Sequence, residues 1–297
     1  MKKKVVTFLL AIAVGLIPAG CSKEQTEISE TMESVVETSV ETQATTVAAE
    51  VTEATSQGED YSSYPLNTTD DCWAVLNAYA TDHGFDALSY PTTLINVLFS
   101  NHDTLDFVLH YPELSGTQDD PSYPGTIDVS SEYSPLRVPY YYQFDSRWGY
   151  KMYAGSEMGF TGGGPTCLAM VATYLTGNTD FNPAWMAAYS ENNGYAMDGG
   201  TSWNLMATGA GGLGIDVVAI TADQDRVDRN LAVGNVIVCL MGPGDFTNGS
   251  AQFIIICNKT ENGYEIRDPG SITRTNQEWQ FETLAAQMTG CWVLRIL

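Results

Sequence analysis

A glycine-rich turn that runs into a helix is the part of this sequence best suited to chemistry. Residues 161–171 read TGGGPTCLAMV. Three consecutive glycines let the backbone approach a ligand closely, and Pro165 suits the first turn of a helix because its missing N–H is not needed there. The free N–H groups of a helix start can bind an anion or stabilise a thiolate. We therefore expect a site at this helix start.

The residues near this helix start are poorly suited to catalysis. Cys167 lies four residues after Gly163, one helical turn further in, and precedes Leu-Ala-Met. That setting predicts a buried packing role. No histidine follows His110, so the C-terminal part of the chain has no imidazole base. His83, His102 and His110 fall at helix edges or beside loops, where we expect solvated or capping histidines.

The cysteine pattern argues against a metal centre. No Cys-x-x-Cys pair and no His/Cys group with zinc spacing occurs, so we expect no metal and no cofactor. Without Cys21 the cysteines are odd in number, which argues against a fully paired disulfide framework. Most of them sit among Leu, Val, Ile and Ala, as buried thiols do; they are Cys72, Cys167, Cys239, Cys257 and Cys291.

The N-terminus reads as a targeting signal. Three lysines (residues 2–4) precede an apolar run over residues 5–17 that is too short to span a bilayer comfortably. The run ends in Pro-Ala-Gly-Cys, which resembles the lipobox of bacterial lipoproteins. Residues 1–21 are then the lipoprotein signal, and the resemblance implies that Cys21 becomes the lipid-modified first residue after cleavage. An ordinary secretory signal with an incidental cysteine is the alternative. Either reading predicts a protein outside the cytoplasm, and the first places it on the outer face of the cytoplasmic membrane.

The net charge of the chain limits the kinds of partner that it can bind. The formal net charge is −23, which excludes nucleic-acid binding in practice because phosphate contacts rest on Lys and Arg. Residues 22–60 are Thr, Glu, Ser and Val with a regular supply of Glu. A segment of this kind buries little and repels itself, so we expect a disordered tether, with a surface helix as the less favoured alternative.

The rest of the chain predicts an α+β protein. Residues 65–114 carry three short helical patterns, and residues 115–136 form a linker rich in Pro, Ser, Asp and Gly. Residues 137–297 begin with helices, one of which we expect Thr201 to cap, and continue with strands rich in Val, Ile and aromatics. Helices first and strands later indicate helices packed on one face of a mostly antiparallel sheet.

Residues 137–297 resemble cysteine peptidase family 39, the papain-like bacteriocin-processing (double-glycine) peptidases, and more closely its extracellular branch of uncertain substrate. The resemblance extends to roughly residue 90 through the helical segment that precedes the domain. Its motifs follow in the family's order and read VPYYYQFDSRWGY, GGPTCLAMVATYLTG, GGTSWNLM, GPGDFT, QFIII and YEIRDPGS. The resemblance implies a papain-like fold.

The resemblance also implies where the catalytic groups would lie. Gly163 stands at the family's nucleophilic cysteine, and Gln252 stands at the histidine, with Ala251 as the alternative position. Asp268 matches the residue that orients the histidine, and Gln143 is the candidate oxyanion donor. Cleft residues are then expected at Gln143, Gly162, Gly163, Gly164, Thr166, Gln252 and Asp268.

Two classes of function follow. The first is a lipid-anchored pseudopeptidase that binds peptide or cell-wall stem peptide at the helix start. The second is an active cysteine peptidase or hydrolase of the family that uses Cys167, another non-standard residue or a partner for the chemistry. A surface protein without a ligand differs from the first class only in lacking the ligand.

Overall fold

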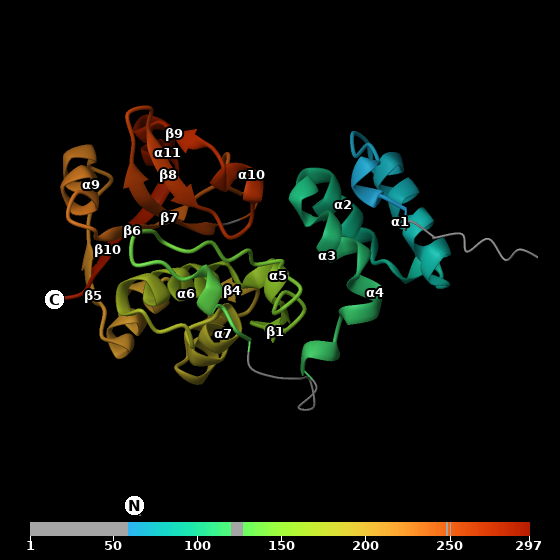
Figure 1. Ribbon diagram of the computed structural model, residues 1–297, viewed down its shortest axis with the longest axis horizontal. Helices are drawn as coiled ribbons and strands as arrows, with labels where there is room; N and C mark the ends of the chain where they lie inside the picture. The colour runs from blue at the N-terminus through green and yellow to red at the C-terminus, as the bar shows by residue number, and fades with distance from the viewer. Residues whose placement is uncertain (1–58, 120–126, 248, 250) are drawn as a thin grey trace, which may run out of the picture. The chain divides into compact units, whose positions relative to one another are not determined.

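A computed structural model describes residues 59–119, 127–247, 249 and 251–297. The predicted signal peptide, the lipidation site Cys21 and nearly all of the predicted tether lie outside the described residues. Residues 57–297 form one compact unit (Figure 1). None of its described helices is long and apolar enough to cross a membrane.

The core of this unit is an antiparallel sheet of six strands in the order β5-β10-β6-β7-β8-β9 (Figure 1). Its strands are β5 (Asp216–Ala219), β6 (Val236–Met241), β7 (Gln252–Lys259), β8 (Tyr264–Arg267), β9 (Glu278–Trp279) and β10 (Met288–Arg295). The register pairs Met241 with Gln252 at the beginning of β7 and Ile255 with Arg267 at the end of β8. The expected α+β class is confirmed.

Helices cover both faces of the sheet, not one face as the order of elements predicts. On one face, Val236, Val238 and Ile255 pack with α6 (Gly163–Thr176) and α7 (Pro183–Asn192). On the other, the alternate residues of the same strands pack with α9 (Gln224–Leu231) and α11 (Phe281–Gln287). Strands buried on both faces read as unbroken apolar runs such as VIVCLM, because neither set of alternate side chains meets water.

The N-terminal helices dock on the rest of the unit. They are α1 (Thr69–His83), α2 (Thr92–Ser100), α3 (Leu105–Leu109) and α4 (Tyr111–Leu114). Phe107 of α3 stacks on Tyr150 with 4.5 Å between ring centroids, and Tyr150 donates its hydroxyl hydrogen to the carbonyl of Phe107. Both side chains are buried in one apolar cluster with Phe144. The helical segment therefore shares a core with the residues that follow position 137.

Several short elements lie between the longer helices and strands. They are β1 (Met152–Tyr153), β2 (Ser156–Glu157), α5 (Met158–Thr161), β3 (Ala196–Met197), β4 (Gly200–Thr201), α8 (Asn204–Ala207) and, after β8, α10 (Ile272–Thr275). Thr201 lies in β4 and does not cap a helix as expected, since α8 begins at Asn204 after the N-cap Trp203. Its hydroxyl instead bonds to that of Tyr153 at 2.8 Å.

Candidate functional site

The site is centred on the first residues of α6. This helix begins at Gly163, follows the N-cap residue Gly162, and has no side chain that caps it. The N–H of Thr166 donates to the carbonyl of Gly162 at 3.0 Å, which closes the first turn. All residues from Gly163 to Thr173 are buried. A helix start is therefore held against the sheet without a capping side chain of its own.

Gln252, the first residue of β7, reaches this helix start. A Cβ atom placed on Gly163 would lie 2.6 Å from Oε1 of Gln252. A Cβ placed on Gly270 would lie 2.7 Å from Nε2 of the same side chain. Both distances are shorter than real Cβ contacts, so the amide occupies space that a side chain at either position would need. Two glycines, 107 positions apart in the chain, make room for one glutamine.

The Gln252 amide joins two further predicted site residues. Its Nε2 donates to Oε1 of Gln143 at 3.3 Å and to Oδ1 of Asp268 at 3.4 Å. Gln143 donates its own Nε2 to the carbonyl of Gly159 at 2.6 Å, and its backbone N–H to the carbonyl of Pro269 at 2.8 Å. The structure therefore brings Gln143, Gly163, Gln252 and Asp268 together, and it places Gln252 rather than Ala251 beside the helix start.

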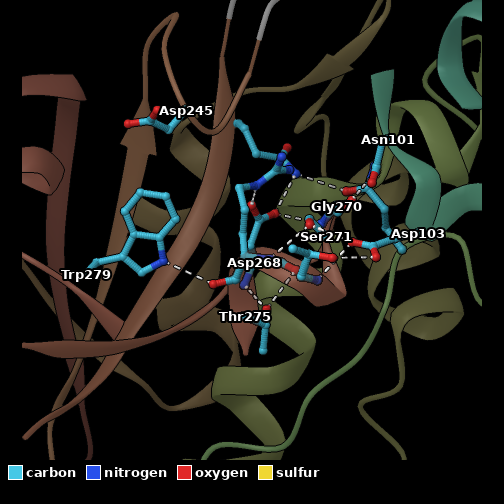
Figure 2. A network of polar contacts seen from close by, with 12 residues as sticks. Asn101, Asp103, Asp245, Asp268, Gly270, Ser271, Thr275 and Trp279 are labelled. Atoms are coloured by element: carbon cyan, nitrogen blue, oxygen red, sulfur yellow. Dashed lines mark hydrogen bonds and ion pairs between the residues drawn. The ribbon is translucent and has the colours of Figure 1, made fainter. Parts of the chain in front are cut away.

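Both carboxylate oxygens of Asp268 already accept hydrogen bonds. Its Oδ1 accepts from the N–H of Gly270 at 2.8 Å in addition to Gln252, and its Oδ2 accepts from Nε of Arg274 at 2.5 Å (Figure 2). The carboxyl is fully buried. Burial raises its pKa, and the charge and hydrogen bond of Arg274, the Gly270 N–H and Gln252 oppose that rise. Arg274 is a partner that sequence reasoning missed.

The helical segment supports the loop that carries this ion pair. Asn101 donates its Nδ2 to the carbonyl of Gly270 at 2.7 Å (Figure 2). The Asp103 carboxylate accepts from the Ser271 hydroxyl at 2.7 Å, and from the N–H and hydroxyl of Thr273 at 2.9 and 2.8 Å. Burial alone would raise the pKa of Asp103, but these hydrogen bonds and the charge of Arg274 outweigh it and lower the pKa. No sequence signal links residues so far apart in the chain.

We expect Asp103→Asn to lower the free energy of unfolding at neutral pH by about 1–2 kcal/mol, since an amide cannot reproduce hydrogen bonds to a carboxylate. A lowered carboxyl pKa stabilises the folded state above the unfolded value of about 3.9 and stops doing so as the pH falls through the folded pKa. The gap between variant and parent should therefore shrink as the pH falls below about 4. Urea unfolding at a series of pH values measures it.

The matched control for this experiment is Asp180→Asn, which alters an exposed carboxylate that makes no hydrogen bond or ion pair with any described residue. It should stay within about 0.5 kcal/mol of the parent at every pH. A gap between Asp103→Asn and the parent that is absent, or that does not vary with pH, would contradict the role given to this carboxylate.

An open cleft of ≈ 280 Å³ lies beside the helix start. Its lining includes Gly163, Gly164 and Gln252. The other lining residues come from α5, the β3–β4 hairpin, α8's N-cap and the sheet, and are Phe160, Thr161, Met197, Asp198, Gly199, Gly200, Thr201, Trp203, Leu240, Ala251 and Phe253. Gly164 packs so closely on this wall that a Cβ there would lie 2.7 Å from the Thr201 side chain.

Four of the predicted cleft residues do not line this cleft. Gln143 and Asp268 lie behind Gln252 and are almost wholly buried. Gly162 is the N-cap of α6. The Thr166 side chain is fully buried and its Oγ1 has no partner within the described residues. These four residues lie around the site without lining its cleft. The open wall of the cleft is formed by Met197, Asp198 and Trp203, which were not predicted as site residues from the sequence.

No described thiol is placed to act as a nucleophile. The expected packing role of Cys167 is confirmed, because its side chain is fully buried. Burial, with a smaller contribution from the charge of Asp268, raises its pKa well above the ordinary value. The described cysteines are all free thiols, and burial raises the pKa of Cys257 to about 11. A hydrogen bond with the Cys239 thiol lowers the pKa of Cys291, but Cys291 is only 5% exposed.

We therefore expect native protein to take up almost no iodoacetamide at Cys167, Cys239, Cys257 or Cys291 at about pH 6. The raised pKa values of the first three thiols keep them protonated there, and burial keeps the reagent from Cys291. Peptide mapping by mass spectrometry measures each cysteine separately and keeps Cys21 apart. The same protein unfolded in urea provides the labelled reference. Fast labelling of Cys167 in the native state would revive the reading of this chain as an active cysteine peptidase.

The described histidines do not supply a base to the cleft either. His83 stacks on Tyr79 with 3.8 Å between ring centroids, and Nδ1 of His110 bonds to the carbonyl of Asp106. His102 is exposed at the start of a short 3₁₀ turn. Within the described residues, no group of three or more His, Cys, Asp or Glu side chains could hold a metal ion. The centre of the site consists of amides, glycines and one ion-paired carboxylate.

Known proteins share a structural similarity with part of this chain. No family model matches the sequence, and no curated protein matches it. Among solved structures, the chain is similar to the peptidase domain of Streptococcus ComA, a bifunctional ABC transporter involved in quorum sensing. The identity is 21%, the match covers 46% of this chain and 92% of that domain, and the TM-score is 0.37.

Proposed function

We propose that this chain is a lipid-anchored, extracytoplasmic protein whose peptidase-like domain binds peptide, or the stem peptide of a cell wall, without cleaving it. The observation that carries the proposal is the pairing of an open cleft with a centre that lacks reactive groups. Gly163 and Gln252 line that cleft, yet neither can form a covalent bond to a substrate or accept a proton at neutral pH.

The arrangement at the centre supports binding over catalysis. Acyl transfer by a thiol needs a nucleophile, a base in hydrogen-bond reach and a group that orients the base. Here the amide of Gln252 lies between Gln143 and Asp268, and Arg274 holds the carboxylate that would orient a base. The Gln252 amide lines the cleft and has hydrogen-bonding capacity that a peptide backbone can use.

The anchor and the tether give this proposal its cellular setting. Lipidation at Cys21 would fix the chain to the outer face of the cytoplasmic membrane. Residues 22–60 would then hold the domain at a distance from the membrane surface. Peptides released outside the cell and the stem peptides of the wall are the ligands within reach of such a domain.

The test is equilibrium binding of the full chain to a library of acetylated and amidated hexapeptides and to soluble muropeptides, followed by mass spectrometry of the recovered ligands. We expect saturable binding of part of the library and recovery of every bound peptide intact. Cleavage by the parent protein would contradict the non-catalytic proposal, and a complete absence of binding would contradict the binding function.

A further inference from the structure

The cleft contains a single ionisable side chain within the described residues, and it is acidic. Asp198 lies in the two-residue turn between β3 and β4, because Met197 pairs with Gly200 across that hairpin. Its side chain is exposed and makes no hydrogen bond or ion pair with any other described residue. A short hairpin thus carries an exposed carboxylate, without a partner among the described residues, to the cleft wall.

An exposed indole lies on the same wall. Trp203 is 52% exposed, and its ring stacks on that of Trp292 with 6.3 Å between centroids and 16° between the planes. Trp292, a residue of β10, is itself buried, so the stack restricts the exposed ring to one side of the cleft. A rigid indole offers a cation its electron-rich face. Carboxylate and indole together are the side chains that recognise an ammonium or guanidinium group.

The surrounding charges favour the same class of ligand. None of the described lysines or arginines lines the cleft. Arg274, which reaches the site centre, is paired with Asp268. With a formal net charge of −23 on the chain, the potential in an acidic cleft attracts cations and repels anions. At the helix start, Oε1 of Gln252 faces the space above Gly163 and would oppose a carboxylate there.

We propose that this cleft selects peptides with a lysine or arginine side chain, which Asp198 pairs with and Trp203 stacks on. The inference rests on the proposed function, since it names the peptide class that the cleft would take. It differs from docking of a ligand carboxylate at the start of α6, the mode that the free helix N–H groups suggest from sequence.

The test compares acetylated, amidated hexapeptides that differ at one central position, which is lysine, norleucine or glutamate. Norleucine keeps the length and apolar stem of lysine without its charge. We expect the full chain to bind the lysine peptide about fivefold more tightly than the norleucine peptide, and the glutamate peptide more weakly than either. Raising NaCl from about 50 to about 500 mM should remove most of the lysine preference, because salt screens exposed charges.

Two variants test which residues produce the preference for the lysine peptide. Asp198→Asn should bring lysine and norleucine peptides to within about twofold of each other, and Trp203→Leu should reduce the preference in part. Glu261→Gln is the matched control, because it changes the net charge equally at an exposed turn outside the cleft, and it should keep the preference.

The outcomes separate the two proposals. Equal binding of the lysine and norleucine peptides, or a lysine preference that survives in Asp198→Asn, would overturn the cationic inference and leave peptide binding intact. Binding of none of the three peptides, while other library members bind in the same cleft, would also overturn it. A complete absence of peptide binding would overturn both.

Discussion

Replacing Gly163 by cysteine together with Gln252 by histidine is expected to create a reactive thiol beside a cleft that no described cysteine lines. The introduced thiol would lie at the first residue of α6, where free N–H groups and the helix dipole stabilise a thiolate. The introduced imidazole would lie where Gln252 now reaches Asp268 at 3.4 Å, and its protonated form would stabilise the thiolate further. Alkylation by iodoacetamide at about pH 6 should be at least about tenfold faster than that of an ordinary exposed thiol.

The single variants are the controls for this gain. Gly163→Cys alone keeps Gln252, whose Oε1 lies 2.6 Å from the position of the new Cβ and must move aside. It also lacks a base, so only the helix start would favour its thiolate, and it should react more slowly than the thiol of the double variant. Gln252→His alone adds no thiol. If the double variant reacts no faster than Gly163→Cys, then residues 163 and 252 do not face each other as described.

The second large effect is expected from Phe107→Ala in the helical segment. Phe107 is 1% exposed and contacts Tyr150, Phe144 and Phe160 of the following domain. Removing a buried aromatic ring leaves a cavity that costs about 3–5 kcal/mol. In a unit of this size the melting temperature should fall by roughly 10 °C. Because the two parts share this core, the whole unit should still unfold in one transition.

Phe99→Ala is the control within the same segment. Phe99 is 44% exposed on α2, so its removal should change the free energy of unfolding by less than about 1 kcal/mol. Differential scanning calorimetry distinguishes the outcomes. Two separate transitions in the parent, or a Phe107→Ala variant as stable as Phe99→Ala, would contradict a shared core.

Much of the main domain could be predicted because local patterns determine it. The apolar runs of β6 and β7 and the helix that follows the glycine turn carry strong periodic signals. The helix nevertheless begins at Gly163, two residues before Pro165, since glycines have no side chain to resist burial there. The sequence did not predict helices on the second face of the sheet, because α11 is short and its helical pattern is weak.

The centre of the site could be predicted only in part. The resemblance selects Gly163, Gln252 and Asp268, which the fold brings together. It does not reveal that Gly270 makes room for Gln252 or that Arg274 holds Asp268. The hydrogen bond between Asp103 and Thr273 joins positions 170 residues apart in the chain. Such contacts depend on tertiary packing, to which a single sequence gives no direct signal.

The glycine turn has a different role in the structure from the one that its sequence predicts. The resemblance noted in the sequence places Gly163 at the position of the family's cysteine. In the structure, it is one of two glycines that make room for the amide of Gln252. The hydrogen-bonded side chain of Gln252 therefore fills the centre of the site. The open space lies alongside it, in the cleft lined by Ala251, Gly164 and Trp203.

The most direct test of binding in this cleft is the affinity of the Ala251→Trp variant for the peptides that the parent binds. Ala251 is exposed at the cleft wall, so an indole there should fill the cleft while the melting temperature stays within a few degrees of the parent. We expect peptide affinity to fall by at least about tenfold, since the ligand loses its apolar contacts there. Unchanged affinity in a variant that folds normally would contradict the central claim that this cleft is the binding site.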